Sequence, residues 1–317
     1  MMDWTDRHCR YFHRLLSRHA RLYTEMVTTG ALLRGDAERH LRFDPSEHPV
    51  ALQLGGSEPD ELAQAARLGE RAGYDEINLN CGCPSERVQH GAFGACLMAE
   101  PALVADCVKA MRDVVAVPVT VKHRIGIDRI EDYGLVRDFV GTLQGAGCEA
   151  FIVHARNAWL KGLSPRENRE VPPLRYDVVH RLKRDFPAAR FVLNGGLGTL
   201  DETMQQSHGL DGVMLGRAAY HDPYLLARVD SVVFGDAGPA PSRADTVMQM
   251  SRYLERECSA GTAARHVVRH MLGLYQGMRG ARRWRRQLSD ADQLESAGAG
   301  ILALALREVE PPLRAAA

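Results

Sequence analysis

Lysine is scarce in this chain of 317 residues, because only four of its 40 basic residues are lysines, at positions 109, 122, 161 and 183. Arginine is therefore the ordinary cation here, and a lysine inside a predicted strand needs a specific explanation. Acidic residues are missing between Cys258 and Ser289, where seven arginines stand. Since the whole chain is neutral, with 40 acidic residues, this basic segment indicates a local contact with a polyanion.

Long apolar runs are also absent, and none approaches the length that spans a bilayer. The first residues, MMDWTDRHCRYFHRLL, carry charges and aromatic rings where a signal peptide needs an unbroken apolar segment. We therefore expect a protein without membrane contact that is located in the cytoplasm. We also expect a monomer.

A disulfide framework is missing too, because the seven cysteines are odd in number and irregular in spacing. Cys81 and Cys83 are separated by one residue, unlike the usual zinc-binding pair, and no second pair follows at zinc-finger spacing. We therefore expect no metal site. Cys9, Cys107 and Cys148 fall in helical patterns or at their ends, and we expect them to pack in the core.

Seven short apolar segments alternate with helical patterns along the first two thirds of the chain. The segments cover residues 21–27, 50–55, 75–80, 118–124, 149–155, 190–196 and 211–217. Between them lie amphipathic helices such as 59–73, with Leu62, Ala65, Ala66 and Gly69 on one face. Alternating strands and helices predict right-handed crossovers and a parallel sheet, and eight such units close a TIM barrel.

An eighth strand should precede the first legible one, but a helical pattern occupies residues 6–19, and residues 1–5 are too few for a strand with its loop. We therefore expect a TIM barrel whose first strand is truncated, because the true start lies upstream or because the barrel is incomplete. After residue 217 the alternation ends, and residues 244–306 predict helices only. We place a barrel domain at 1–240 and an all-helical domain at 241–317.

Candidate functional side chains stand at the predicted carboxyl ends of the strands, where parallel barrels carry their sites. These positions are Met2, Gln53, Asn80, Lys122, Arg124, His154, Asn194 and Arg217. Glycines in NGGLGT (194–199) and GRAAY (216–220) suit close approach to a phosphate group. Lys122 suits a ring that accepts electrons, because a cation stabilises the charge of a reduced flavin. The pattern predicts one phosphate-bearing planar cofactor.

Five motifs together resemble the tRNA-dihydrouridine synthases, specifically their A subfamily: NLNCGCPSERVQHGAFGACLM, VTVKHRIGID, FIVHARNAWLKGLSPRENREVPPLRY, LNGG and GVMLGRAAY. The resemblance covers almost the whole chain. It implies an FMN-bearing TIM barrel with a C-terminal helical domain. It also implies a flavin-dependent enzyme that uses NADPH to reduce uridines of the tRNA D-loop, of the 20/20a type, to 5,6-dihydrouridine.

The resemblance also implies roles for individual residues. The family's catalytic cysteine corresponds to Cys83, which would give a proton to C5 of the uracil after hydride passes from flavin N5 to C6. A thiol with a pKa of about 8.5 is mostly protonated at neutral pH, as a proton donor must be. Cys81 is then incidental and Cys96 a packing residue. The implied FMN contacts are Met2, Gln53, Lys122, His154, Asn194, Gly195, Gly196, Gly216 and Arg217.

For tRNA the resemblance points to Asn80, which would touch the flipped uridine, and to Arg166, Arg169, Arg279 and Arg282. The last two lie in the acid-free segment that the charge distribution marks independently. Phosphate contacts would make the affinity salt-dependent, and the target base must leave its stack to reach the flavin. The family has Ala-Pro before MMDWTD and this sequence begins inside that motif, which leaves the Met2 contact open.

Two other functions stay open from the sequence. A flavin barrel that reduces a free pyrimidine or an enone would leave the basic segment unexplained, and an RNA-binding protein without catalysis would fit an incomplete first strand. The motif RGARRWRR (279–286) is also compatible with an ordinary solvated helix face. Flavin absorbance and salt-sensitive binding of tRNA separate these alternatives.

Overall fold

The computed structural model describes residues 1–85, 88, 91–130 and 132–310. Contacts within the chain define two compact units, of which the first comprises residues 1–2 and 21–216. The second comprises residues 3–20 and the chain from residue 217 onward. The boundary expected near residue 240 therefore falls inside the second unit, which also takes in the helix near the N-terminus.

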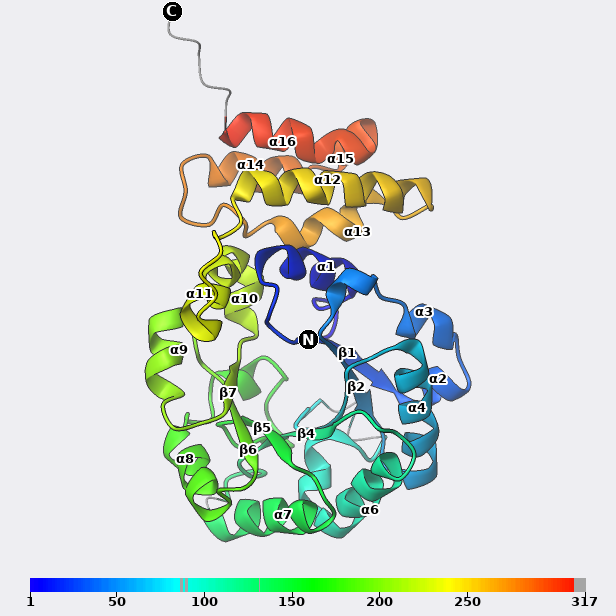
Figure 1. Ribbon diagram of the computed structural model, residues 1–317, viewed down its shortest axis with the longest axis vertical. Helices are drawn as coiled ribbons and strands as arrows, with labels where there is room; N and C mark the ends of the chain where they lie inside the picture. The colour runs from blue at the N-terminus through cyan, green and yellow to red at the C-terminus, as the bar shows by residue number, and fades with distance from the viewer. Residues whose placement is uncertain (86–87, 89–90, 131, 311–317) are drawn as a thin grey trace, which may run out of the picture. The chain divides into compact units, whose positions relative to one another are not determined.

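A curled, fully parallel sheet of seven strands in sequential order forms the first unit (Figure 1). Its strands are β1 (Leu22–Thr28), β2 (Val50–Gly55), β3 (Glu76–Cys81), β4 (Val119–Arg124), β5 (Ala150–His154), β6 (Arg190–Asn194) and β7 (Gly212–Met214). All seven strands expected from the sequence are confirmed, and their order is that of a TIM barrel. In the described part of the chain, β1 and β7 are the edges of this sheet.

Helices lie on the outside of the curled sheet, as Figure 1 shows for α4, α6, α7 and α8. The helices and 3-10 turns of this unit are α2 (Thr29–Leu33), α3 (Ala37–Leu41), η1 (Pro45–Glu47), α4 (Pro59–Ala72), η2 (Gly94–Ala99), α6 (Pro101–Arg112), α7 (Tyr133–Gly145), η3 (Glu167–Arg169), α8 (Tyr176–Asp185) and α9 (Leu200–Gln206).

Helix α4 illustrates how the sequence forms these elements. Asp60 and Glu61 stand in its first turn, where carboxylates complement the helix dipole, and Gly73 ends the helix with φ 98°. The four residues predicted to share one face, Leu62, Ala65, Ala66 and Gly69, are all buried. The periodicity of this segment therefore predicted both its bounds and its buried side.

The two faces of the sheet differ in polarity. Leu52 on β2 and Ile77 on β3 are fully buried in the apolar core. Because side chains alternate along a strand, the next residues point to the opposite face, which is the inside of the curl. There Gln53, Asn78 and Thr120 occupy paired positions on β2, β3 and β4. The interior of this sheet is therefore lined by polar side chains that the strands hold in register.

The second unit is helical in its described part, as predicted for the residues after 240. Its helices and 3-10 turns are α1 (Arg7–Leu16), α10 (Arg217–His221), η4 (Pro223–Arg228), α11 (Val229–Phe234), α12 (Arg243–Ser259), α13 (Ala264–Val268), η5 (Arg269–Met271), α14 (Ala281–Ser289), α15 (Ala291–Ala297), η6 (Gly298–Gly300) and α16 (Ile301–Val309). Among the helices of both units that the structure describes, none has the length and apolar composition of a membrane span.

Side chains of α1 explain why the N-terminal segment belongs to this unit. The ring of Tyr11 stacks on Tyr253 of α12 with centroids 4.0 Å apart. His8 Nδ1 lies 2.7 Å from the hydroxyl of the same tyrosine. Before the helix, an Asp6 carboxylate oxygen lies 3.0 Å from Nε2 of His270. These contacts join α1 to helices more than 200 positions away along the chain, which no local sequence pattern specifies.

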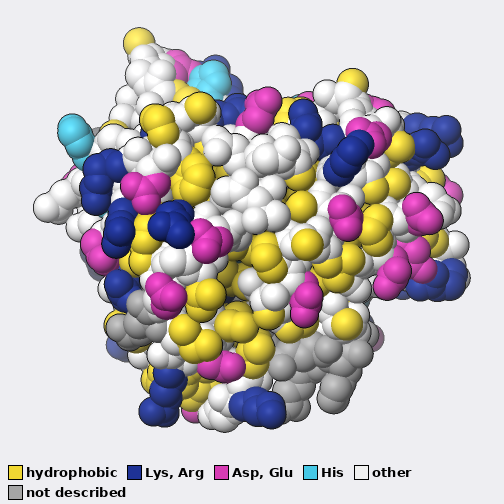
Figure 2. Space-filling model, turned by 90° about the horizontal axis from the view of Figure 1, so that it is seen from below, with side chains coloured by type: hydrophobic (Ala, Val, Ile, Leu, Met, Phe, Trp, Pro, Cys, Tyr) yellow, Lys and Arg dark blue, Asp and Glu magenta, His cyan; other side chains and the backbone are white. Residues whose placement is uncertain are grey.

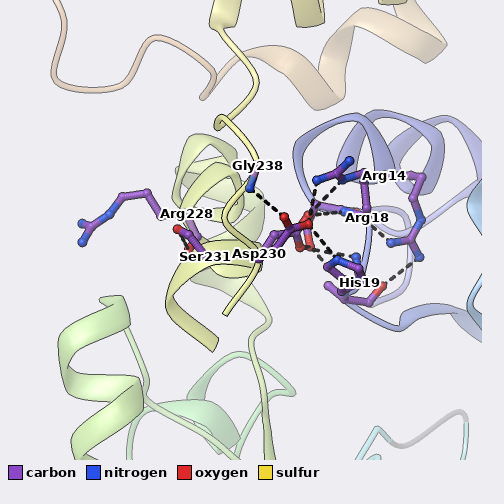
Figure 3. A network of polar contacts seen from close by, with 10 residues as sticks. Arg14, Arg18, His19, Arg228, Asp230, Ser231 and Gly238 are labelled. Carbon is purple, nitrogen blue, oxygen red and sulfur yellow. Dashed lines mark hydrogen bonds and ion pairs between the residues drawn. The ribbon is translucent and has the colours of Figure 1, made fainter. Parts of the chain in front are cut away.

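Asp230 of α11 anchors the chain that follows α1 (Figure 3). Its carboxylate accepts hydrogen bonds from Ser17 Oγ at 2.5 Å and from the backbone N–H of Arg18 at 2.7 Å. The side chains of Arg18 and His19 contact Asp236 at 2.6 and 2.9 Å. His19, Asp230 and Asp236 have ligand atoms within 4.8 Å of one another, but the two carboxylates already accept protein hydrogen bonds. These contacts explain the cluster as a structural anchor.

Candidate functional site

Five of the predicted site residues form one connected row on strands β2 to β6. Asn80 Nδ2 donates to Gln53 Oε1 at 2.8 Å, and Lys122 Nζ donates to Asn194 Oδ1 at 3.1 Å. The strand register places Asn80 beside Lys122 and His154 beside Asn194. Because all five stand at or near the carboxyl ends of parallel strands, they meet where barrels bind their ligands. Of the eight strand-end residues expected from the sequence, the structure thus joins these five in one row.

The ammonium group of Lys122 is buried and lies near a second cation, Arg124, so its environment disfavours the positive charge. Burial and, to a smaller extent, the charge of Arg124 lower the pKa of its ammonium from 10.5 to about 7, while Cys83 opposes the shift. Among the described residues, the acceptor of its hydrogen bond is Asn194. A desolvated ammonium of this kind gains from an anion or an electron-rich ring placed against it.

His154 and the glycines after β6 shape the neighbouring part of the site. Burial, with the charges of Arg124 and Lys122, lowers the pKa of His154 well below 6.5, so its ring is neutral and offers one donor and one acceptor. Gly195 has φ 115°, and a Cβ there would lie 2.5 Å from Cδ2 of His154. Gly196 has φ 73°. Only glycine lets the backbone pass this close to the imidazole.

The backbone around Cys83 is held from several sides. Asn80 Oδ1 accepts hydrogen bonds from the N–H groups of Gly82 and Cys83, both at 3.0 Å. The carbonyl of Gly82 accepts from Arg124 Nε at 3.1 Å, and the carbonyl of Cys83 accepts from the N–H of Ala95 at 2.9 Å. The turn after β3 therefore presents Cys83 in a defined backbone position beside the row of strand-end residues.

The two neighbouring cysteines lie in opposite environments. Cys81 has no exposed surface, and burial raises its pKa well above 9. Cys83 is half-buried, and its thiol lies 3.6 Å from Ser85 Oγ. Cys96 is also half-buried, with its Sγ 3.1 Å from the carbonyl oxygen of Phe93. Cys9, Cys107 and Cys148 are buried as predicted, and all seven thiols are free.

Arg124 has a positioning role that sequence reasoning did not assign, although it named the residue at a strand end. Its guanidinium is buried, which lowers its pKa to about 9. Besides Gly82, it donates to the carbonyls of Asn157 at 3.3 Å and Asn168 at 3.0 Å. It thereby ties the cysteine turn to the loop after β5. The available signal was an arginine two positions after Lys122, on the same face of a buried strand.

The remaining predicted cofactor residues are divided between the units. Met2 belongs to the first unit, and its side chain is 56% exposed. Gly216 is the last residue of that unit, with a Cβ position 3.4 Å from Met1 Sδ. Arg217 opens α10 in the second unit. The structure therefore places Met2 and Gly216 in the first unit and Arg217 in the second.

Two of the predicted tRNA contacts lie in the first unit, in the loop after β5. Arg166 and Arg169 are exposed at η3. Nε of Arg166 lies 3.8 Å from a carboxylate oxygen of Glu170, an exposed pair that contributes little to stability. On the face shown in Figure 2, Lys and Arg side chains are interspersed with Asp and Glu rather than gathered by sign.

Helix α14 of the second unit is strongly one-sided. Trp284 is fully buried and its Nε1 donates to the carbonyl of Met271 at 2.8 Å. Arg279, just before the helix, and Arg282 within it are exposed. Residues 282, 283 and 285, all arginines, help to line a surface pocket of 420 Å³. The helix is thus anchored by the buried tryptophan, while arginines of the cluster are exposed to solvent.

Comparison with known proteins gives a consistent result. A family model described as dihydrouridine synthase (Dus) matches residues 1–310. The tRNA-dihydrouridine(20/20a) synthase of Pseudomonas putida (strain KT2440) is 63% identical over 289 residues, which cover 91% of this chain and 86% of that protein. The protein of the same name in Escherichia coli (strain K12) is 57% identical over 310 residues, which cover 98% of this chain and 90% of that one.

A solved structure supports the fold alone. A 2-naphthoyl-CoA reductase complex matches with a TM-score of 0.54 and 12% sequence identity, over 72% of this chain and 47% of that one. At this identity the likeness carries no information on function.

Proposed function

The chain belongs to the dihydrouridine synthase family, and we propose that it reduces uridines of tRNA to 5,6-dihydrouridine at the 20/20a positions named for its relatives. The resemblance inferred from the sequence motifs is thereby confirmed. The observation that carries the proposal is the placement of Cys83, whose turn is held by Asn80, itself a member of the connected row.

The residues present fit FMN as the cofactor. Lys122 is a desolvated cation, His154 is neutral, and the backbone at Gly195 passes within reach of the imidazole. When bound, a flavin reduced by NADPH supplies hydride to C6 of the uracil. The residues that we propose to hold it are those implied by the family: Met2, Gln53, Lys122, His154, Asn194, Gly195, Gly196, Gly216 and Arg217.

Cys83 then acts as the general acid. Addition of hydride at C6 leaves negative charge at C5, and a proton donated by the thiol at C5 completes the reduction of the double bond. A thiol suits this role because its S–H group can give a proton to a developing carbanion. Asn80 keeps one N–H beyond its bond to Gln53, and we propose that this group contacts the flipped base.

Binding of tRNA is assigned to two groups of arginines. In the first unit they are Arg166 and Arg169, and in the second they are Arg279 and Arg282. All four are exposed, and arginine recognises phosphate through paired N–H donors. We propose that the first unit carries the chemistry and that the second contributes to tRNA binding. We further propose a monomer in the cytoplasm, which sedimentation of the native protein and cell fractionation would test.

The decisive experiment incubates the purified protein with FMN, NADPH and tRNA that lacks dihydrouridine. Nucleoside mass spectrometry, followed by mapping of the modified positions, should find dihydrouridine at 20 and 20a. Free uridine and a simple enone serve as alternative substrates. Reduction of these with tRNA unchanged would support the free-pyrimidine or enone reductase instead. Colourless protein that binds tRNA but cannot take up FMN would support a binding protein without catalysis.

A further inference from the structure

A continuous chain of side-chain hydrogen bonds, three of them buried and the last partly buried, runs through the first unit toward Cys83. It joins five residues, which we call the Glu76–Asn80 network: Glu76, Thr120, Asn78, Gln53 and Asn80. Three of them, Glu76, Asn78 and Asn80, stand at alternate positions of β3 and so share one face. Gln53 and Thr120 are their paired neighbours on β2 and β4.

One end of the network can only accept hydrogen bonds. The Glu76 carboxylate is buried and forms an ion pair with Arg21. It also accepts from the hydroxyl of Tyr23 at 2.8 Å, and burial beside Glu76 raises the pKa of that phenol well above 10, which keeps it a donor. Thr120 Oγ1 lies 2.6 Å from the same carboxylate and must therefore give it its only hydrogen.

The other end can only donate. The backbone N–H groups of Gly82 and Cys83 both point at Asn80 Oδ1, so the oxygen of this amide faces the cysteine turn. The amide nitrogen of Asn80 must then face Gln53 Oε1, at 2.8 Å. Gln53 in turn donates to Asn78 Oδ1 at 2.8 Å.

The requirements at the two ends of the network allow only one direction of hydrogen-bond donation, from Asn80 toward Glu76. Asn78 Nδ2 donates to Thr120 Oγ1 at 2.7 Å, which accepts because its hydrogen is used by Glu76. Reversing any one amide would set two acceptors or two donors against each other, and Asn78 has no exposed surface through which water could compensate. The orientation of each amide is therefore dictated from both ends of the network.

We propose that Glu76, Thr120 and Asn78 are positioning residues, which fix the amide orientation of Gln53 and Asn80 and thereby the backbone of the Cys83 turn. The expected effect of these residues on dihydrouridine formation rests on the proposed function. The positioning role means that Asn80 presents an N–H as its unused group, because its oxygen already accepts two hydrogen bonds, and that Gln53 also keeps one N–H beyond its bond to Asn78. The site is thus built to give hydrogen bonds to acceptor atoms of a bound ring.

Thr120→Val tests this proposal, because it removes one hydroxyl of the network and changes the size of the side chain little. Thr120→Ser restores the hydroxyl. Thr203→Val is the matched control, since Thr203 of α9 in the same unit is fully buried and its hydroxyl donates to the carbonyl of Thr199. Circular dichroism establishes that each variant is folded. Thr120→Ala removes the same hydroxyl without placing a methyl group against Glu76, and it replaces Thr120→Val if that protein is insoluble.

Two measurements are made on each variant. The first is the rate at which iodoacetamide modifies Cys83 in flavin-free protein, relative to Cys96, read by peptide mass spectrometry. The second is kcat and KM for dihydrouridine formation on tRNA. Thr120→Val should change the Cys83/Cys96 ratio and lower kcat by about fivefold, the factor that one net hydrogen bond is worth. KM for tRNA should stay constant, and Thr120→Ser should restore both quantities.

The outcomes separate the two proposals. Equal effects of Thr120→Val and Thr203→Val, or no effect of Thr120→Val on either measurement, would overturn the positioning role. If the wild-type protein forms no dihydrouridine while Thr120→Val alone changes the reactivity ratio, the positioning role stands and the proposed enzymatic function fails.

Discussion

Lys122 on β4 reaches past β5 to donate a hydrogen bond to Asn194 on β6, at 3.1 Å. The side chain lies inside the curl of the sheet, where burial lowers its pKa to about 7. An ammonium in this position costs stability in the free protein and is useful only when an anionic or electron-rich group is bound. This relationship leads to two predictions.

Lys122→Met should stabilise the flavin-free protein. The folded pKa of about 7 lies below the ordinary 10.5, so the unfolded chain holds the proton more tightly. The resulting penalty is complete below pH 7 and disappears as the pH rises from 7 to 10.5. We expect Tm to rise by about 3 °C at pH 6.5, the shift given by roughly 1 kcal/mol in a domain of this size, and less at pH 9.5. Lys109→Met, at an exposed lysine, is the control and should leave Tm unchanged.

The affinity for FMN should fall as the pH rises. The protonated form of Lys122 attracts the anionic cofactor, and its pKa in the free protein is about 7. Above this pH, binding must take up a proton, so the dissociation constant should increase by up to about tenfold per pH unit. Fluorescence titrations between pH 7 and 9 avoid the second ionisation of the phosphate, near pH 6. A wild-type affinity for FMN that does not change with pH would contradict this role. So would a Lys122→Met variant whose affinity depends on pH as strongly as that of the wild type.

Cys83→Ala should abolish dihydrouridine formation while retaining binding of FMN and tRNA. Cys81→Ala should stay active, because its sulfur is packed in the core with no exposed surface. The smaller side chain should cost the latter variant stability, by about 1 kcal/mol for a small buried residue. Activity is measured by nucleoside mass spectrometry and stability by chemical unfolding. Equal loss of activity in both variants would show that the wrong sulfur has been assigned.

Gly195→Ala should weaken FMN binding and destabilise the protein. A Cβ at this position meets Cδ2 of His154 at 2.5 Å, in addition to the strain of φ 115°. Gly209→Ala separates the two effects, since Gly209 has φ 78° with no atom within 4 Å of its Cβ position. The control should lose about 1–2 kcal/mol of unfolding free energy and keep its FMN affinity. If both variants bind FMN equally well, close approach at Gly195 does not shape the site.

The double variant Arg279→Ala/Arg282→Ala should weaken the binding of different tRNA sequences to a similar degree. Removing an arginine that binds a phosphate should reduce the slope of log affinity against log salt by about 1. Binding is measured by filter retention at several salt concentrations, with kcat on saturating tRNA as a check on the chemistry. Arg137→Ala removes an exposed arginine that pairs with Asp138 in the first unit, and it should leave the slope unchanged. An equal change of slope in both proteins would indicate a nonspecific effect of charge.

Much of the first unit was predictable because its information is local. Short apolar, β-branched runs between helical segments predicted the seven strands, and the apolar face of α4 was identified residue by residue. The strand ends then placed Gln53, Lys122 and His154 at one edge, because parallel strands share a direction. The division into two units was not predictable in the same way. The amphipathic pattern of α1 shows that one face is buried, but not that Tyr253 of α12 covers it.

The sequence by itself determined the strands and the family and led to the proposal of Cys83 as the proton donor, because all three depend on residue types at fixed local spacing. Only the tertiary structure decided how the side chains are joined. Asn78 forms a hydrogen bond with Thr120, which lies 42 positions away in the sequence, and Gln53 forms one with Asn80, which lies 27 positions away. Such contacts depend on the register between strands, which brings distant residues within hydrogen-bond distance and lets Glu76 determine the direction of a network that ends at Cys83.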